Sequence, residues 1–378
     1  MFNRMGIGNR YWSAAALVLT LGVGGCTQAN QTAQQPDAEA PTASTAEQPQ
    51  VVATSTVLCD LTQQIAADTI DLTCLLSPNQ DPHVYAATPS DRKAIEDADL
   101  VLYGGYNYEP GLIRIIQATT TPAAKVAVFE AAVPKPLLGK EHDHGHDHGE
   151  EHDHGDETAH DHDHDHTHES ETAANLDTAD HDHGAEADLV PDPHIWHNAL
   201  NGVAIARVIE TNLSQVAPEH AAQYQQNAAA LTRQLTNLDD WIKTQVATVP
   251  VPERKLVTTH EALGYFADAY GFTVAGAIKG LSTEEKPSAA RLTELADQLK
   301  QSQVPAVFIE TTTNPKLIET VAREANVTVA ETPLFIEGPG GEGTPAPTYQ
   351  DMLISNTCTI VNALGGRCDS ATAPRGDS

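Results

Sequence analysis

Histidine is the residue type whose number and spacing most strongly indicate chemistry in this chain. Thirteen of its eighteen histidines lie between Glu141 and His183, interleaved with aspartate and glutamate, in a tract that begins EHDHGHDHGEEHDHG. An imidazole with an ordinary pKa of about 6.5 is neutral near pH 7 and is a good ligand for zinc, copper and nickel. We therefore expect a low-affinity metal loop at these histidines: His142, His144, His146, His148, His152, His154, His160, His162, His164, His166, His168, His181 and His183.

The composition of this tract argues against a packed core. Residues 141–168 contain no Leu, Ile, Val, Phe, Trp or Met. Without apolar surface to bury, nothing offsets the entropy lost on ordering, so we predict a disordered insertion over residues 139–188. The tract indicates that a transition metal matters here, but not what the protein does with it.

Three dispersed histidines are better candidates for a built site. His83 and His194 each end an Asp-Pro-His triplet, and His260 ends the apolar run KLVTTH. Because proline fixes its own φ and restricts the residue before it, each triplet predicts a stiff turn that aims its histidine. Any one of them alone is most simply a turn residue, but the three together favour metal ligation. We interpret His197 as lying beside the site or on the surface.

Two blocks of alternating apolar runs and helical patterns must position these histidines. They cover residues 51–130 and 254–364, and such repeated strand–helix units favour parallel sheets with helices on both faces. Among them we expect KVAVF to be a strand and EALGYFADAYG to be a helix that begins at Glu261. His83 follows the run IDLTCLL, so His83 and His260 both lie near the carboxyl ends of expected strands. Sheets of this kind place their ligand sites at that edge.

A long helical pattern separates the two blocks. Spacings of three and four relate its apolar positions, and at about 1.5 Å per residue the helix would be roughly 40 Å long. We predict an α/β fold of two βα-sandwich lobes joined by one long helix, with the metal site in the interlobe cleft. The expected parts are a lipoprotein signal peptide at 1–26, a flexible tether at 27–50, an N-terminal α/β lobe at 51–216, the connecting helix at 217–249, a C-terminal α/β lobe at 250–368 and a tail at 369–378.

The charge of the chain is concentrated in the histidine tract. Residues 141–188 hold eighteen acidic and no basic side chains, and removing those charges from the formal −31 leaves −13. Nucleic acid is therefore excluded as an expected partner, because its binding needs a basic surface. An acidic protein favours a cationic partner.

The N-terminus has the pattern of an export signal. Arg4 and Arg10 precede an apolar run, Ala14 to Val23, that is too short to span a bilayer permanently. The residues that follow, Val23-Gly24-Gly25-Cys26, resemble a bacterial lipoprotein cleavage box, which predicts Cys26 as the lipid anchor. The alternative is an ordinary signal peptide with an incidental cysteine. The Thr-, Ala-, Gln- and Pro-rich residues up to Gln50 are typical of a flexible tether.

Four cysteines remain in a protein expected to reach a compartment where disulfides persist. Four cysteines allow three connectivities. We favour Cys59–Cys74 and Cys358–Cys368, because these pairs close short loops. A thiolate zinc site is the alternative, although the chain has no CxxC pair.

Four segments of the chain together form a recognisable pattern. They are Asp81-Pro82-His83-Val84-Tyr85 with Thr88-Pro89-Ser90-Asp91, Asp192-Pro193-His194-Ile195-Trp196, Thr259-His260-Glu261-Ala262-Leu263-Gly264-Tyr265-Phe266, and Gly343-Thr344-Pro345 through Thr348-Tyr349. With these segments the chain resembles the metal-specific solute-binding proteins of bacterial ABC importers, in the cluster that takes up zinc and manganese. The resemblance covers essentially residues 51–365.

The resemblance implies that His83, His194 and His260 are metal ligands. The fourth ligand of the family is usually an aspartate, and the register through Thr348-Tyr349 places Glu337 there. Glutamate is one methylene longer, so either Glu337 or a water is the expected fourth ligand. Three imidazoles with one oxygen make a tetrahedral site, which suits Zn²⁺, whereas Mn²⁺ prefers more oxygen donors. Manganese-type sites in this family carry a carboxylate where His260 stands.

The expected function is therefore a zinc receptor, lipid-anchored in the periplasm or at the cell surface, and not an enzyme. Its expected partners are an ABC permease and a separate ATPase subunit, because the chain lacks a GxxxxGK[ST] phosphate loop. We expect a monomer. The alternatives are a periplasmic zinc buffer or chaperone that works through the tract, a manganese receptor, and a zinc hydrolase.

Overall fold

The computed structural model describes residues 48–140, 189–284 and 286–375. The predicted signal peptide, the lipid-anchor residue Cys26, nearly all of the tether and the thirteen histidines of the tract lie outside these residues. No helix among the described residues is long and apolar enough to cross a membrane.

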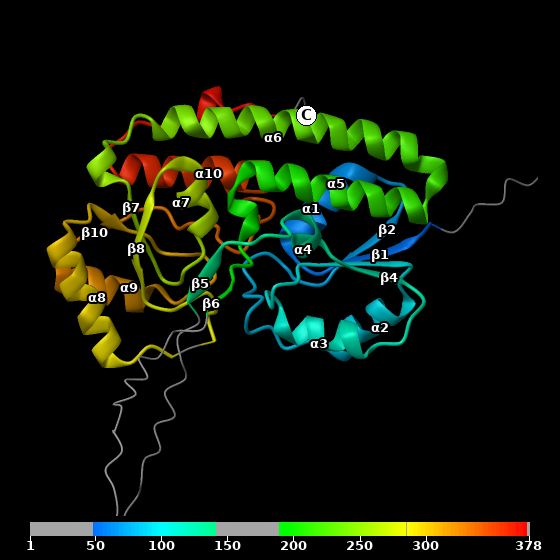
Figure 1. The fold of residues 1–378 in the computed structure, drawn as a ribbon, viewed down its shortest axis with the longest axis horizontal. Coiled ribbons are helices and arrows are strands. Elements are labelled where there is room, and N and C mark those ends of the chain that lie inside the picture. The colour runs from blue at the N-terminus through cyan, green and yellow to red at the C-terminus, as the bar shows by residue number, and fades with distance from the viewer. Residues whose placement is uncertain (1–47, 141–188, 285, 376–378) are drawn as a thin grey trace, which may run out of the picture. The chain divides into compact units, whose positions relative to one another are not determined.

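The first lobe is built on a four-stranded parallel sheet in the order β2-β1-β3-β4 (Figure 1). Its strands are β1 (Gln50–Ala53), β2 (Asp71–Cys74), β3 (Leu100–Tyr103) and β4 (Ala124–Ala127). The intervening helices are α1 (Thr56–Ala66), α2 (Pro89–Asp97) and α3 (Pro110–Ala118), with the short α4 (Val128–Ala132) after β4. Every residue of the central strands β1 and β3 is apolar except Gln50, as expected of strands covered on both faces.

The second lobe repeats this arrangement. Its strands are β7 (Lys255–Thr258), β8 (Thr273–Ala277), β9 (Ala306–Val307) and β10 (Thr328–Val329). The pairs β7–β8 and β9–β10 are parallel, and Phe308 N donates to Val257 O at 2.9 Å, which places β9 beside β7. The order β8-β7-β9-β10 therefore matches the first lobe, with the first strand of each block between the second and the third. The helices of this lobe are α7 (Gly264–Tyr270), α8 (Ala289–Ser302), α9 (Pro315–Ala325) and α10 (Tyr349–Ala363).

Two helices lie between the lobes in the sequence. They are α5 (Ala199–Val216) and α6 (Ala221–Val246), and α6 packs on α5, α1 and α10, so that it contacts helices from both blocks (Figure 1). The apolar side chains of α6 that recur at spacings of three and four, from Tyr224 to Ile242, are buried. The predicted α/β class with two parallel-sheet lobes and a long helix between them is confirmed.

Three local expectations were wrong. The helix expected from Glu261 begins at Gly264, because Glu261 N donates to Gly280 O and Ala262 N donates to His260 O, which makes a turn instead. The run KVAVF is a strand only to Ala127 and then turns into α4. Residues 139 and 140, placed in the insertion, belong to β5 (Leu138–Lys140), which pairs antiparallel with β6 (Leu189–Pro191).

The cysteines pair locally, as the short loops favoured. Cys59 on α1 is joined to Cys74 on β2, and Cys358 on α10 is joined to Cys368. The first disulfide ties a helix to the edge strand of the first sheet, and the second ties α10 to the chain that follows it.

Candidate metal centre

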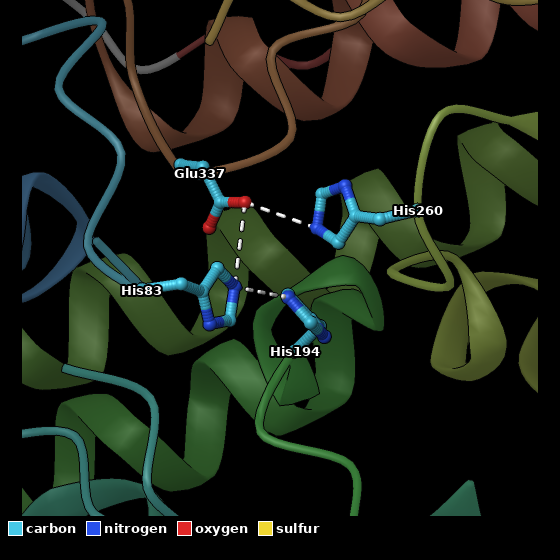
Figure 2. A group of neighbouring side chains, drawn as sticks. All are labelled: His83, His194, His260 and Glu337. Atoms are coloured by element: carbon cyan, nitrogen blue, oxygen red, sulfur yellow. Dashed lines mark hydrogen bonds and ion pairs between the residues drawn. The ribbon is translucent and has the colours of Figure 1, made fainter. Parts of the chain in front are cut away.

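Four side chains from distant parts of the sequence converge between the two sheets. His83, His194, His260 and Glu337 each offer one ligand atom, and these atoms all lie within 4.8 Å of one another (Figure 2). His83 Nε2 lies 3.3 Å from His194 Nε2, and Glu337 Oε1 lies 3.7 Å from His83 Nε2 and 3.1 Å from His260 Nε2. All four residues are buried, with at most 6 % of their surface exposed.

The two Asp-Pro-His triplets fold into the same turn. Asp81 Oδ1 accepts a hydrogen bond from His83 N at 3.0 Å, and Asp192 Oδ1 accepts one from His194 N at 2.9 Å. In each case an aspartate binds the backbone two residues further on, a local bond that acts with the rigid proline between them. Each triplet therefore fixes the backbone from which its histidine side chain projects, independently of any metal.

His83 and His194 reach the site from different elements. His83 lies in the loop between β2 and α2, whose end is set by a capping box between Thr88 and Asp91. His194 lies three residues after the end of β6 and precedes the turn η1 (Ile195–His197) and then α5. Asp192 Oδ1 also accepts from His194 Nδ1 at 2.9 Å, which leaves His194 Nε2 as the nitrogen that faces the site.

His260 is held by a carboxylate that the sequence analysis missed. Glu310, just after β9, accepts from His260 Nδ1 with Oε2 at 2.8 Å. Its other oxygen accepts from Thr259 N at 2.8 Å and from His260 N at 3.1 Å. Because β7 and β9 are neighbours, Glu310 sits at the carboxyl edge of the same sheet as His260. The sequence signal for this role was that Glu310 ends the apolar run PAVFIE, as His260 ends the run KLVTTH.

Glu337 comes from the loop between β10 and α10. Within the described chain no conventional hydrogen bond uses either oxygen of its carboxylate, which is buried. Oε1 instead faces the Nε2 atoms of His260 and His83 (Figure 2). A buried carboxylate is costly unless a positive charge satisfies it, and here a protonated His260 or a bound metal ion can supply that charge.

Burial and charge give the three histidines different protonation. Burial lowers the pKa of His83 to about 4, and burial together with the nearby His260 and His83 lowers the pKa of His194 well below its ordinary value. Burial also acts to lower the pKa of His260, but Glu310 and Glu337 outweigh it and hold this pKa well above its ordinary value. His83 and His194 are therefore neutral, as metal coordination by an imidazole requires, whereas His260 carries a proton between the carboxylates of Glu310 and Glu337.

His197 does not join this group. It is buried, at 1 % exposed, so the expectation that it could be a surface residue was wrong. Burial lowers its pKa to about 3, and its Nε2 finds no hydrogen-bond partner among the described residues. Its ring packs against Trp196, with centroids 5.5 Å apart.

The donor set fits a divalent transition metal. In a tetrahedral site with bonds of about 2.0–2.1 Å, neighbouring ligand atoms are roughly 3.3 Å apart. The recorded separations of 3.1, 3.3 and 3.7 Å lie around that value. Three neutral nitrogens and one carboxylate oxygen also combine the borderline and hard donors that such ions accept.

A two-lobed α/β protein with a buried cation site between its parallel sheets defines a class of solute-binding proteins. Comparison with protein families identifies this chain within that class: residues 51–363 match the family described as zinc-uptake complex component A, periplasmic, and the chain belongs to it. It is a metal-binding receptor component of an ABC importer and not an enzyme, which excludes the zinc-hydrolase alternative.

Known relatives differ in the metal that they bind. The manganese-binding lipoprotein MntA of Bacillus subtilis is 29 % identical over 362 residues, covering 93 % of this chain and 98 % of that protein. The zinc-binding protein TroA of Treponema pallidum is 29 % identical over 320 residues, covering 84 % and 89 %. A solved structure of TroA superposes with a TM-score of 0.67 at 28 % identity, covering 84 % of this chain and 99 % of TroA.

Proposed function

We propose that this protein is a high-affinity zinc receptor that delivers Zn²⁺ to the permease of an ABC importer. The observation that carries the proposal is the convergence of three buried imidazole Nε2 atoms with one buried carboxylate, that of Glu337. His83, His194, His260 and Glu337 act as the metal ligands. The ion is the cargo of the protein, so the site must both hold it and release it.

The nitrogen-rich donor set supports zinc over manganese. Two of the three imidazoles are oriented through Nδ1 by a carboxylate, Asp192 for His194 and Glu310 for His260. Such partners fix the ring tautomer and make the ligating nitrogen more basic. Manganese prefers additional oxygen ligands, and Glu337 supplies at most two. Because the relative TroA is zinc-binding and the relative MntA is manganese-binding, any test must compare the two metals.

The N-terminal segment supports attachment to a membrane. We propose that Cys26 carries a lipid and that residues 27–50 tether the receptor in the periplasm or at the cell surface. Relatives in the family carry the word lipoprotein in their names. The permease and its ATPase subunit are the proposed partners, and the receptor acts as a monomer. The histidine tract supplies weak zinc binding that feeds the buried site.

Competition binding tests the proposal. We compare the full chain with a chain in which a two-residue Asn-Gly turn replaces residues 141–188, because Lys140 and Leu189 are paired between β5 and β6 and such a turn can connect them. The shortened chain should keep one tight zinc and prefer it to manganese, and His260→Ala should abolish that site. His220→Ala, at the start of α6 and outside the centre, is the matched control.

Two results would contradict the zinc receptor. If the deletion removes all tight zinc binding, the tract is the working part and the protein is a zinc buffer. If the shortened chain binds manganese more tightly than zinc, it is a manganese receptor.

A further inference from the structure

We propose that the hydroxyl of Tyr108 is a positioning group that holds Glu337 in the metal centre from the opposite lobe. The inference rests on the proposed role of Glu337 as a ligand. Tyr108 lies between β3 and α3 in the first lobe, whereas Glu337 belongs to the second block, 229 residues further on. Tyr108 Oη donates to the backbone carbonyl of Glu337 at 3.2 Å.

The backbone leading to Glu337 is held at each residue. Asn356 accepts from Phe335 N at 2.9 Å and donates to Phe335 O at 2.8 Å. Trp196 Nε1 donates to Ile336 O at 3.0 Å. At Glu337 the carbonyl accepts from Tyr108 and, at the longer distance of 3.4 Å, from Thr56 Oγ1. The consecutive carbonyls of Ile336 and Glu337 thus accept hydrogen bonds from the side chains of Trp196 and Tyr108. Because these bonds use only the backbone, the Glu337 carboxylate can face the metal.

Gly338 shows how closely this loop approaches the first lobe. A Cβ at this position would lie 2.2 Å from Thr56 Oγ1, and its φ of +129° is one that other residues rarely adopt. Only glycine allows the chain to turn away directly after Glu337 while its carbonyl stays against Thr56 and Tyr108. The close approach and the hydrogen bonds therefore describe one contact between the loop and the first lobe.

The ring of Tyr108 is itself fixed, so its hydroxyl has a defined direction. It is 1 % exposed and packs against Trp196 and Phe129, with centroids 4.8 and 5.7 Å apart. Its ring also meets the edges of His83 and His194, at centroid distances of 5.5 and 6.1 Å. Tyr108 therefore contacts two ligand rings and the backbone of the fourth ligand.

Holding the backbone of Glu337 in place compensates for the length of its side chain, which is one methylene longer than that of aspartate. A longer side chain has one more rotatable bond, so its carboxylate reaches a metal at a greater cost in ordering. Fixing the backbone of Glu337 removes part of that freedom before binding, as ligand sites require of their supporting groups. Loss of the Tyr108 hydroxyl should thus loosen Glu337 and shorten the time for which zinc stays bound.

Zinc release from the full chain tests this directly. Each chain is loaded with one equivalent of zinc and mixed with excess chelator, and the slow phase that His260→Ala abolishes reports the buried site. Tyr108→Phe should accelerate this phase about fivefold, the range expected for one hydrogen bond. Tyr106→Phe is the matched control, since its hydroxyl also donates to a backbone carbonyl, Val133 O at 2.8 Å, away from the centre.

A double-mutant comparison separates positioning from a general structural effect. In chains that carry Glu337→Ala, Tyr108→Phe should add nothing to the release rate. If Tyr108→Phe matches Tyr106→Phe, or if it accelerates release equally without Glu337, the inference is overturned. If wild-type protein shows no slow phase that depends on His260, the proposed function itself fails, and the inference fails with it.

A backbone variant gives an independent test should Tyr108→Phe fold poorly. Gly338→Ala forces the loop away from Thr56, so it should also accelerate zinc release. Gly343→Ala is the control, because Gly343 has a positive φ of +80° but open space around a Cβ. Equal release rates for the two alanine variants would overturn the inference.

Discussion

Glu310→Gln should weaken zinc binding by about 10- to 100-fold, although Glu310 does not face the metal. The carboxylate of Glu310 accepts three N–H groups, two from the backbone on Oε1 and one from His260 Nδ1 on Oε2. Glutamine has the same shape but a single acceptor oxygen, and its amide nitrogen can only donate. Either the two backbone N–H groups or His260 Nδ1 must therefore lose the oxygen that accepts from them.

Both orientations of the amide disturb the centre. If the oxygen stays with the two backbone N–H groups, the amide nitrogen faces His260 Nδ1, and the ring moves its proton to Nε2, where no lone pair remains for zinc. If the oxygen faces Nδ1, the amide nitrogen opposes two backbone donors. Losing a charge-assisted hydrogen bond costs about 1.5–3 kcal/mol, which corresponds to roughly a 10- to 100-fold loss of affinity.

Asp192→Asn is the informative comparison for Glu310→Gln. Asp192 makes both of its bonds to His194 with one oxygen, Oδ1, so an asparagine oxygen in that place can keep both. Burial also raises the pKa of Asp192 to about 7, so a neutral amide is a small change in charge. We expect its zinc affinity to fall less than about fivefold, well below the effect of Glu310→Gln.

Competition titration with a zinc-binding dye measures the affinities, and ¹H–¹⁵N spectra of the imidazoles report the tautomers. Wild-type His260 should carry its proton on Nδ1 in the zinc-bound protein. A Glu310→Gln affinity within twofold of wild type would refute this account of Glu310, as would equal losses in the two amide variants.

Three further predictions concern protons, ligands and stability. Zinc affinity should fall at least tenfold per pH unit between about pH 7.5 and 5.5, because the raised pKa of His260 leaves one proton to displace, Asp192 with a pKa of about 7 adds up to one more, and His83 with a pKa of about 4 stays neutral; a slope of three protons, or no slope, in calorimetric titrations would contradict this. His260→Ala should cost more zinc affinity than Glu337→Ala in the same titrations, since the deeper-buried imidazole has both a carboxylate partner and a metal-facing nitrogen; comparable losses would make Glu337 an equal ligand. Replacing Cys59 and Cys74 together by serine should lower the free energy of unfolding by about 3 kcal/mol, as expected for a loop of 15 residues, with zinc affinity unchanged; denaturant unfolding and zinc titration together check it, and a matching loss of affinity would show that the disulfide shapes the site.

The sequence predicted what depends on local pattern. Alternating apolar runs and helical spacings give the strand–helix order of each lobe, because they reflect which residues face a core. The Asp-Pro-His triplets that end in His83 and His194 could also be recognised, because the aspartate bonds to the backbone only two residues further along the chain. The cysteine pairs were also favoured from their short separations.

Contacts made across the sheets could not be foreseen in this way. Glu310 reaches His260 over 50 residues, and only the adjacency of β7 and β9 brings them together. The hydroxyl of Tyr108 reaches Glu337 across the two lobes, and nothing in the segment YGGYNYE indicates that partner. The start of α7 was misplaced because turn hydrogen bonds around His260 compete with the helix that Glu261 and its neighbours would otherwise begin.

The hairpin of β5 and β6 makes the chain between residues 140 and 189 replaceable. Its ends are paired, Lys140 with Leu189 and Leu138 with Pro191, and Asp192 N then donates to Leu137 O at 2.8 Å. His194 follows two residues later, so its place does not depend on how many residues are inserted beyond Lys140. Loop length changes the entropy of closure only slowly. A fluorescent protein domain inserted at this hairpin would therefore lie three residues in the chain from the turn that carries the proposed ligand His194, a placement suited to a genetically encoded metal sensor.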